Sequence, residues 1–385
     1  MRESYLPYGK QWIDNDDIKA VVDVLKSDYL TTGPNIAEFE KAFAQYVDAK
    51  FAVAICNGTA ALHAACYAAG IQADDEVITT PITFAASANA VLYCGGTPVF
   101  ADINAATYNI DPSEIRKKIT SKTKAIIPVH FTGQPCDMDG IGRIAKEYNL
   151  IVIEDAAHAV GADYKGKKIG SISGMTTFSF HPVKHITTGE GGMITTNSEE
   201  LYQKLLLFRS HGITRDKAKM HSNQGSWYYE QLDLGYNYRL TDIQAVLGHS
   251  QLNKVDKFLK RRREIVAMYT EAFKDNNLLT VPYQQAGCNS SWHLYVIKLN
   301  LERLSCGRKE VFEALQRENI GVNVHYIPVY KHPYYQQNGY RDVKCIHSEN
   351  LYERIISLPI FPKMTNQDVQ DVINSVKTIL ERNEK

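Results

Sequence analysis

The sequence predicts an α/β protein in which a mainly parallel central sheet, flanked by helices, is followed by a smaller α+β domain. From residue 51 onward, short apolar runs alternate with segments of helical spacing, and this alternation implies right-handed crossovers between parallel strands. The pattern changes near residue 240, where a long amphipathic segment begins. The length of 385 residues is sufficient for two domains.

The first half of the chain supplies the sheet and the helices that cover it. Apolar runs predict strands at residues 51–56, 76–79, 97–100, 124–129, 150–153 and 177–180. Apolar residues at helical spacing predict helices at 59–69, 85–93, around 115–119 and at 138–148. Because the carboxyl ends of parallel strands meet at one edge of a sheet, functional side chains should gather there.

The C-terminal part predicts a different arrangement. We expect helices at 241–274, 309–319 and 367–382 and strands at 292–299 and 321–325. A helix near residues 16–25 should join this smaller domain. The expected division is an N-terminal segment (1–35) that packs with the small domain, a large domain (36–250) and the small domain itself (251–385).

The composition narrows the class of protein. Lysine plus arginine equals aspartate plus glutamate, 43 against 43, which argues against a nucleic-acid partner. The polar N-terminus lacks the apolar core of a signal peptide, and no apolar run approaches the roughly 20 residues of a membrane span. Seven scattered cysteines without a Cys-x-x-Cys pair indicate reduced thiols. We therefore expect a cytoplasmic protein that does not bind a membrane.

Two ionisable residues that follow apolar strands suggest a cofactor. Lys184 follows the run 177–180 and precedes a Gly-Glu-Gly-Gly turn, and Asp155 ends the run that begins at Leu150. A buried lysine amine becomes less basic and more nucleophilic. In a pyridoxal phosphate (PLP) enzyme such an amine forms a Schiff base with the cofactor. A carboxylate keeps the pyridine nitrogen protonated, so that the ring accepts electrons.

Each of these residues also has an ordinary interpretation. A lysine after an apolar run is more often a surface residue with its amine in water, and the aspartate is about as often a cap or turn residue. His158, three residues after Asp155, would bind the cofactor or stack over it, although a lone histidine is more often structural. The functional interpretation depends on these residues occurring together.

A phosphate site is predicted at residues 57–61. A strand ends there, Gly58 permits close approach of the backbone and Thr59 opens a helix, and such helix starts bind anions through free N–H groups and the helix dipole. Ser179 offers a second hydroxyl. Phe84 offers a ring that could stack on the pyridine, with a core phenylalanine as the alternative. Many unrelated helices begin this way, so the signal is weak alone.

Other cofactors fit the sequence less well. Residues 161–168 imitate a phosphate-binding loop, but Lys168 stands where a magnesium ligand is required. No Gly-x-Gly-x-x-Gly follows the early strands, which counts against a dinucleotide. His181 and His185 have helical spacing, but Pro182 lies between them and the glutamate of a zinc helix is missing. No metal is expected.

Taken together, these residues resemble the DegT-type sugar-nucleotide aminotransferases, a branch of the fold type I PLP enzymes. The matching stretches extend through most of the chain, at 30–33, 57–62, 154–158, 178–184, 188–192, 209–212 and 235–244. Residues 209–216 and 324–329 look most like the branch that serves pseudaminic acid synthesis. That branch aminates C4 of a UDP-linked 4-keto-6-deoxy-N-acetylhexosamine. Branches that act on other 4-keto sugars share most of these motifs.

The resemblance implies a role for each matching residue. Lys184 would carry the cofactor and shuttle the proton, and Asp155 would hold the pyridinium. Thr59, Ala60 and Ser179 would bind the phosphate, and Asn237 would reach it across a homodimer interface, so that the active sites are shared. Arg239 would bind the carboxylate of the amino donor, L-glutamate. The sugar nucleotide would contact Tyr8, Ser27, Asp28, Tyr29, Leu30, His325 and Tyr326.

Rival functions can be stated. A variant branch of the family dehydrates sugars and replaces the lysine by histidine, so the lysine at position 184 favours transamination. A non-catalytic protein of the same fold that binds a sugar nucleotide is a second alternative, and the presence of both Lys184 and Asp155 speaks against it. A nicotinamide-dependent sugar dehydrogenase is disfavoured by the missing glycine motif. The motifs do not distinguish the nucleotide, the configuration of the new amine, or a dimer from an assembly of dimers.

Overall fold

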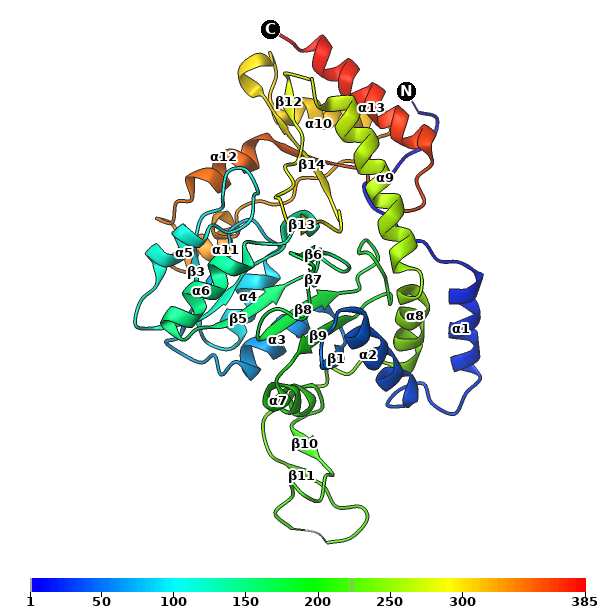
Figure 1. Cartoon of the computed structure of the whole chain (residues 1–385), viewed down its shortest axis with the longest axis vertical. Helices are drawn as coiled ribbons and strands as arrows, with labels where there is room; N and C mark the ends of the chain where they lie inside the picture. The colour runs from blue at the N-terminus through cyan, green and yellow to red at the C-terminus, as the bar shows by residue number, and fades with distance from the viewer. Residues whose placement is uncertain (1, 223) are drawn as a thin grey trace.

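The computed structural model, which describes residues 2–222 and 224–385, is built around a seven-stranded sheet (Figure 1). In spatial order its strands are β1 (Phe51–Ile55), β9 (Gly192–Thr196), β8 (Met175–Ser179), β5 (Ile151–Asp155), β4 (Thr123–Ile127), β2 (Glu76–Thr79) and β3 (Thr97–Phe100). β9 is antiparallel to both of its neighbours, whereas the pairings from β8 through β3 are parallel. The predicted α/β class and mainly parallel sheet are confirmed.

Helices cover both faces of this sheet, because the strands bury side chains on both sides. β1 sends Ala52 and Ala54 into one core and Val53 and Ile55 into the other, as the alternation of a strand requires. The first core is completed mainly by α2 and α6, and the second by α3, α4 and α7. The helices of this region are α2 (Pro34–Tyr46), α3 (Gly58–Ala68), α4 (Ala86–Tyr93), α5 (Pro112–Lys118), α6 (Met138–Tyr148) and α7 (Glu199–Arg209).

The rest of the chain adds further helices and three small sheets. The remaining helices are α1 (Asn15–Leu25), α8 (Asp242–Leu252), α9 (Val255–Phe273), α10 (Arg308–Arg317), α11 (Pro333–Gln337), α12 (Ile346–Arg354) and α13 (Asn366–Arg382). The small sheets pair β12 (Leu279–Thr280), β14 (Tyr295–Leu299) and β15 (Ile355–Leu358); β13 (Cys288–Asn289), β6 (Asp163–Tyr164) and β7 (Lys167–Lys168); and β10 (Ile213–Thr214) with β11 (Glu230–Gln231).

A separate apolar core lies in the C-terminal part, where α10 and α13 pack with α9 and the sheet β12-β14-β15. α9 joins both cores, since Leu259 belongs to the core of the large sheet and Tyr269 to the C-terminal core. The N-terminal segment also contacts both parts: the Leu6 N–H donates to the Asn319 carbonyl over 2.9 Å, whereas α1 packs on α8. The division at residues 35 and 250 stays a prediction.

Two predicted elements are wrong. The helix expected over 241–274 is two helices, α8 and α9, which break where Gln251 and Lys254 bind the buried Asp17 of α1. The strand expected over 321–325 is reduced to a single bridge between Asn323 and Ser357. Beyond that bridge, His325 turns into the cavity described below and contacts the Ser357 hydroxyl.

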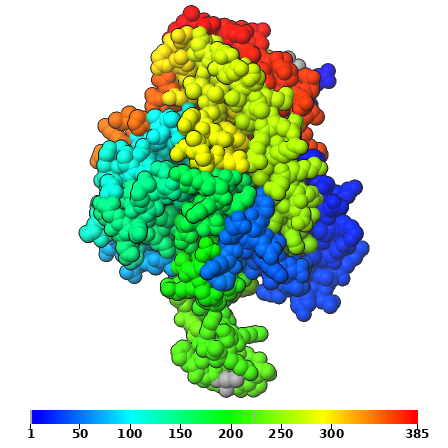
Figure 2. Space-filling view, in the orientation of Figure 1, coloured from blue at the N-terminus to red at the C-terminus, as the bar shows by residue number. Residues whose placement is uncertain are grey.

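The hairpin of β10 and β11 projects from the body of the molecule below α7 in the view of Figures 1 and 2. Within residues 2–222 and 224–385, no helix combines the length and hydrophobicity that crossing a bilayer requires.

Candidate active site

A cavity of about 860 Å³ lies at the carboxyl ends of β5 and β8. The first turn of α3 and the segment that follows Gly321 complete its wall. The structure brings together many of the predicted site residues here: the lining includes Tyr8, Thr59, Ala60, Phe84, Asp155, His158, Ser179, Lys184, His325 and Tyr326.

Lys184 lies in the turn after β8, where its N–H donates to the His181 carbonyl over 2.9 Å. Burial lowers the pKa of its amine, the charge of Asp155 opposes this shift and the charge of Arg262 adds to it, and the net pKa is about 8. Arg262 is itself fully buried and donates to the carbonyls of Trp292, His293 and Ile360. The interpretation of Lys184 as a solvated surface lysine therefore does not hold.

Asp155 ends β5 with its carboxylate held in place on two sides. The Ser87 hydroxyl donates to Oδ2 over 2.7 Å, and the Ala157 N–H donates to Oδ1 over 3.1 Å. Ser87 is in turn 2.8 Å from the Thr83 hydroxyl. Asp155 thus accepts a local backbone hydrogen bond, as a turn residue would. It also presents a fixed carboxylate to the cavity that contains Lys184.

His158 lies between aromatic neighbours on the same wall. Its Nε2 is 3.1 Å from the Tyr326 hydroxyl, and its ring lies 4.3 Å from that of His293. Burial, with the nearby charge of Lys184, holds the pKa of His158 well below its usual range, so the imidazole is neutral. Its Nδ1 is fully buried and has no hydrogen-bond partner among the described residues.

The start of α3 lies beside Ser179, where the phosphate site was predicted. A Cβ added to Gly58 would lie 2.9 Å from the Ser179 Cβ, so only glycine allows this close approach. The Asn57 side chain accepts from the Ala60 N–H over 2.8 Å. This leaves the N–H groups of Gly58 and Thr59, which a helix does not satisfy internally, available to a phosphate.

The remaining predicted residues do not line the cavity that residues 2–222 and 224–385 of one chain form. Asn237 is exposed and its backbone bridges Ser210. The others in this group are Ser27, Asp28, Tyr29, Leu30 and Arg239. Phe84 does line the cavity and is 65% exposed, so the alternative of a core phenylalanine is wrong.

Sequence reasoning missed Ser87, which supports Asp155 without lining the cavity, and several residues that do line it. Ser87 is the most informative, because it bonds Asp155 yet sits in a run of small residues that gives no chemical signal. His63 and Tyr238, whose side chains are 3.2 Å apart, extend the wall beyond the start of α3. Asn323 joins beside His325. His63 lies one helical turn after Thr59 and Asn323 two residues before His325, whereas Ser87 and Tyr238 enter the site only through tertiary packing.

The chain belongs to the DegT/DnrJ/EryC1/StrS aminotransferase family, whose model matches residues 11–377. It is a sugar aminotransferase, and its cofactor is pyridoxal 5′-phosphate. The cavity fits this cofactor: it holds an amine of lowered pKa, a fixed carboxylate and a helix start that lies close beside Ser179.

Two relatives match over nearly the full length. The chain is 45% identical over 381 residues to a spore coat polysaccharide biosynthesis protein of Bacillus subtilis, covering 98% of each. It is 39% identical over 383 residues to the UDP-4-amino-4,6-dideoxy-N-acetyl-beta-L-altrosamine transaminase of Campylobacter jejuni, covering 99% of each.

Solved structures agree with this membership. The chain resembles the Helicobacter pylori aminotransferase involved in pseudaminic acid biosynthesis with a TM-score of 0.92 and 35% identity, covering 98% of this chain and 100% of that one. It resembles the PLP form of a putative sugar aminotransferase from Streptococcus pneumoniae with a TM-score of 0.91 and 32% identity, covering 98% and 99%.

Proposed function

We propose that this enzyme transfers the amino group of L-glutamate to C4 of a UDP-4-keto-6-deoxy-N-acetylhexosamine. The product would be a UDP-4-amino-4,6-dideoxy sugar for pseudaminic acid or a related surface glycan. The observation that carries the chemistry is the Lys184 amine, with a pKa of about 8, in one cavity with the fixed Asp155 carboxylate. The substrate is supported by the similarity to the Campylobacter and Helicobacter enzymes.

Bound pyridoxal phosphate supplies an aldehyde and a ring that accepts electrons. Lys184 would hold the cofactor, then use its free Nζ to take the α-proton of glutamate and later to return a proton to sugar C4. An amine with a pKa of about 8 is neutral in roughly a tenth of molecules at pH 7. Asp155 would keep the ring nitrogen protonated, and Thr59 and Ser179 would hold the phosphate.

The wall opposite α3 suits a neutral, hydroxyl-rich sugar. Burial lowers the pKa of His325 to about 3 and raises the pKa of Tyr326, so both side chains are uncharged at neutral pH. Tyr8 packs against His325 with ring centroids 5.5 Å apart. We therefore place the sugar against Tyr8, His325 and Tyr326, with Phe84 at the exposed rim.

We further propose a cytoplasmic homodimer with shared active sites. Asn237 and Arg239 lie outside the cavity of one chain, as does the segment 27–30, and they would complete the site of a second copy. Exposed apolar side chains near the projecting hairpin, with Trp227 at 71% and Leu234 at 72% exposure, support contact with a partner.

A substrate panel tests the function. Holoenzyme is incubated with glutamate and UDP- and dTDP-linked 4-keto-6-deoxy sugars, and the aminated product is identified by NMR. We expect amination at C4 of the UDP-linked N-acetylhexosamine, abolished by Lys184→Ala. If the enzyme aminated only a different nucleotide-linked keto sugar, the proposed substrate would be wrong and that sugar would take its place. A wild-type protein whose visible spectrum does not respond to glutamate would be a non-catalytic binder.

A further inference from the structure

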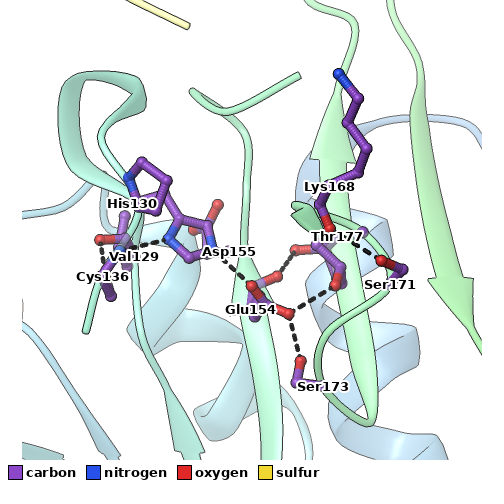
Figure 3. A network of polar contacts seen from close by, with 12 residues as sticks. Val129, His130, Cys136, Glu154, Asp155, Lys168, Ser171, Ser173 and Thr177 are labelled. Atoms are coloured by element: carbon purple, nitrogen blue, oxygen red, sulfur yellow. Dashed lines mark hydrogen bonds and ion pairs between the residues drawn. The ribbon is translucent and has the colours of Figure 1, made fainter. Parts of the chain in front are cut away.

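Glu154 precedes Asp155 and points to the opposite face of the sheet, since successive side chains of a strand alternate. It is fully buried and does not line the cavity. Its carboxylate is the centre of the network in Figure 3. Nothing in the chemistry above uses it, and a buried acid costs stability unless its oxygens are well bonded.

Three side chains from two segments donate to the Glu154 carboxylate. His130, just beyond β4, approaches Oε2 through Nε2 at 2.7 Å, and the hydroxyls of Ser173 and Thr176 donate to Oε1 over 2.5 and 3.1 Å. The Thr177 hydroxyl also donates to the Glu154 carbonyl over 3.1 Å. The carboxylate therefore ties together β4, β5 and the start of β8.

The tautomer of His130 fixes the charge of this network. The Cys136 N–H donates to His130 Nδ1 over 3.0 Å, so Nδ1 carries no proton. The ring proton is then on Nε2 and is donated to Glu154, and His130 is neutral. Within residues 2–222 and 224–385, Glu154 has no lysine or arginine partner. The carboxylate of Glu154, which accepts from three donors, is thus a negative charge without a cationic partner in the residue next to Asp155.

The same network holds the backbone of Asp155. The His130 N–H donates to the Asp155 carbonyl over 3.1 Å, and the Asp155 N–H donates to the Pro128 carbonyl over 2.9 Å. Movement of His130 would therefore displace the residue whose carboxylate enters the cavity.

We propose that Glu154 is a positioning residue that acts through Asp155. Its hydrogen bonds fix the end of β5, and its charge, in a low-dielectric setting, assists Asp155 in keeping the ring nitrogen of the cofactor protonated. This inference rests on the proposed role of Asp155. It assigns a function to a side chain that never touches the cofactor or the substrate.

The test uses Glu154→Gln holoenzyme reconstituted with PLP labelled with ¹⁵N at the ring nitrogen. We expect the ¹⁵N resonance to move from the protonated position toward the unprotonated one, and the half-reaction with glutamate to slow about 10- to 100-fold. Glu40→Gln is the matched control, because Glu40 is another well-bonded acid, paired with Arg209. It should leave the resonance unchanged.

The outcomes separate this inference from the proposed function. A Glu154→Gln enzyme with wild-type resonance and rate overturns the inference. If Asp155→Asn also leaves the resonance unmoved, the role of Asp155 is wrong instead. Should Glu154→Gln not fold, Ser173→Ala removes one donor and keeps the charge. By loosening the end of β5 it should displace Asp155 and shift the resonance part of the way, and coincidence with wild type would reject the positioning role of Glu154.

Discussion

The reactivity of Lys184 follows from competing influences on one amine. Burial and the charge of Arg262 disfavour its protonated form, whereas Asp155 in the same cavity favours it. The resulting pKa of about 8 leaves the amine nucleophilic in part at neutral pH.

This pKa predicts how the cofactor-free protein captures PLP. Only the neutral amine attacks an aldehyde, so the capture rate should rise about tenfold from pH 7 to pH 9 and then level off. The rise would be followed by stopped-flow absorbance, with Lys184→Ala as the control that lacks specific capture. A rate that still climbs in proportion to hydroxide above pH 9 would mean an ordinary solvated lysine.

Ser87 should matter because it orients Asp155. Ser87→Ala removes the 2.7 Å hydrogen bond to Oδ2, which is worth about 1 kcal/mol, so the half-reaction with glutamate should slow about fivefold to tenfold. Ser113→Ala, at the exposed start of α5, is the control and should react at the wild-type rate. Equal rates for the two variants would show that Asp155 needs no support from Ser87.

Among single residues, the sequence predicted the ionisable ones that follow apolar strands. Lys184 and Asp155 were found that way, and the structure places both in one cavity. Ser87 was not found, because its contact with Asp155 joins residues 68 positions apart and depends on tertiary packing that brings the first turn of α4 to the end of β5.

At the scale of elements, the start of α3 depends on the absence of a side chain. Gly58→Ala would place a Cβ 2.9 Å from the Ser179 Cβ and force the helix start away from that hydroxyl. We expect the dissociation constant of PLP to rise by about tenfold or more, measured by fluorescence titration.

Gly142→Ala is the matched control for that substitution. Gly142 is an exposed residue within α6, and a Cβ there meets nothing within 4 Å. Alanine should leave PLP binding unchanged and raise the unfolding free energy by up to about 1 kcal/mol. If both variants bind PLP like the wild type, the close contact with Ser179 is not what shapes the phosphate site.

Most elements were predictable because their apolar periodicity is strong. The failures have physical causes. α8 and α9 read as one helix because the break at Asn253 needs no glycine or proline, and it is set by the contacts of Gln251 and Lys254 with α1. Residues 321–325 read as a strand, but they follow the cavity wall after the single bridge to Ser357.

At the scale of the whole molecule, the proposed homodimer places Lys184 and Asn237 of one site on different chains. A dimer would have about twice the 43.4 kDa mass of the chain, measurable by light scattering. Inactive Lys184→Ala and Asn237→Ala proteins, mixed through a reversible dissociation step, should regain about a quarter of wild-type activity. Half of the randomly formed dimers would be mixed, and each would carry one intact site.

That recovery distinguishes a shared site from a self-contained one. If each site took both residues from the same chain, the mixture would show only the average activity of the two variants. The fold alone did not decide this question, because the surfaces that meet a partner lie outside the contacts of a single chain.

The most direct test of the central claim is to locate the cofactor's bond. Holoenzyme is reduced with borohydride, digested and analysed by mass spectrometry. We predict a stable pyridoxyl group on the peptide that contains Lys184 and on no other lysine. A reduced adduct at a different residue, or no adduct in a protein that contains PLP, would contradict the assignment.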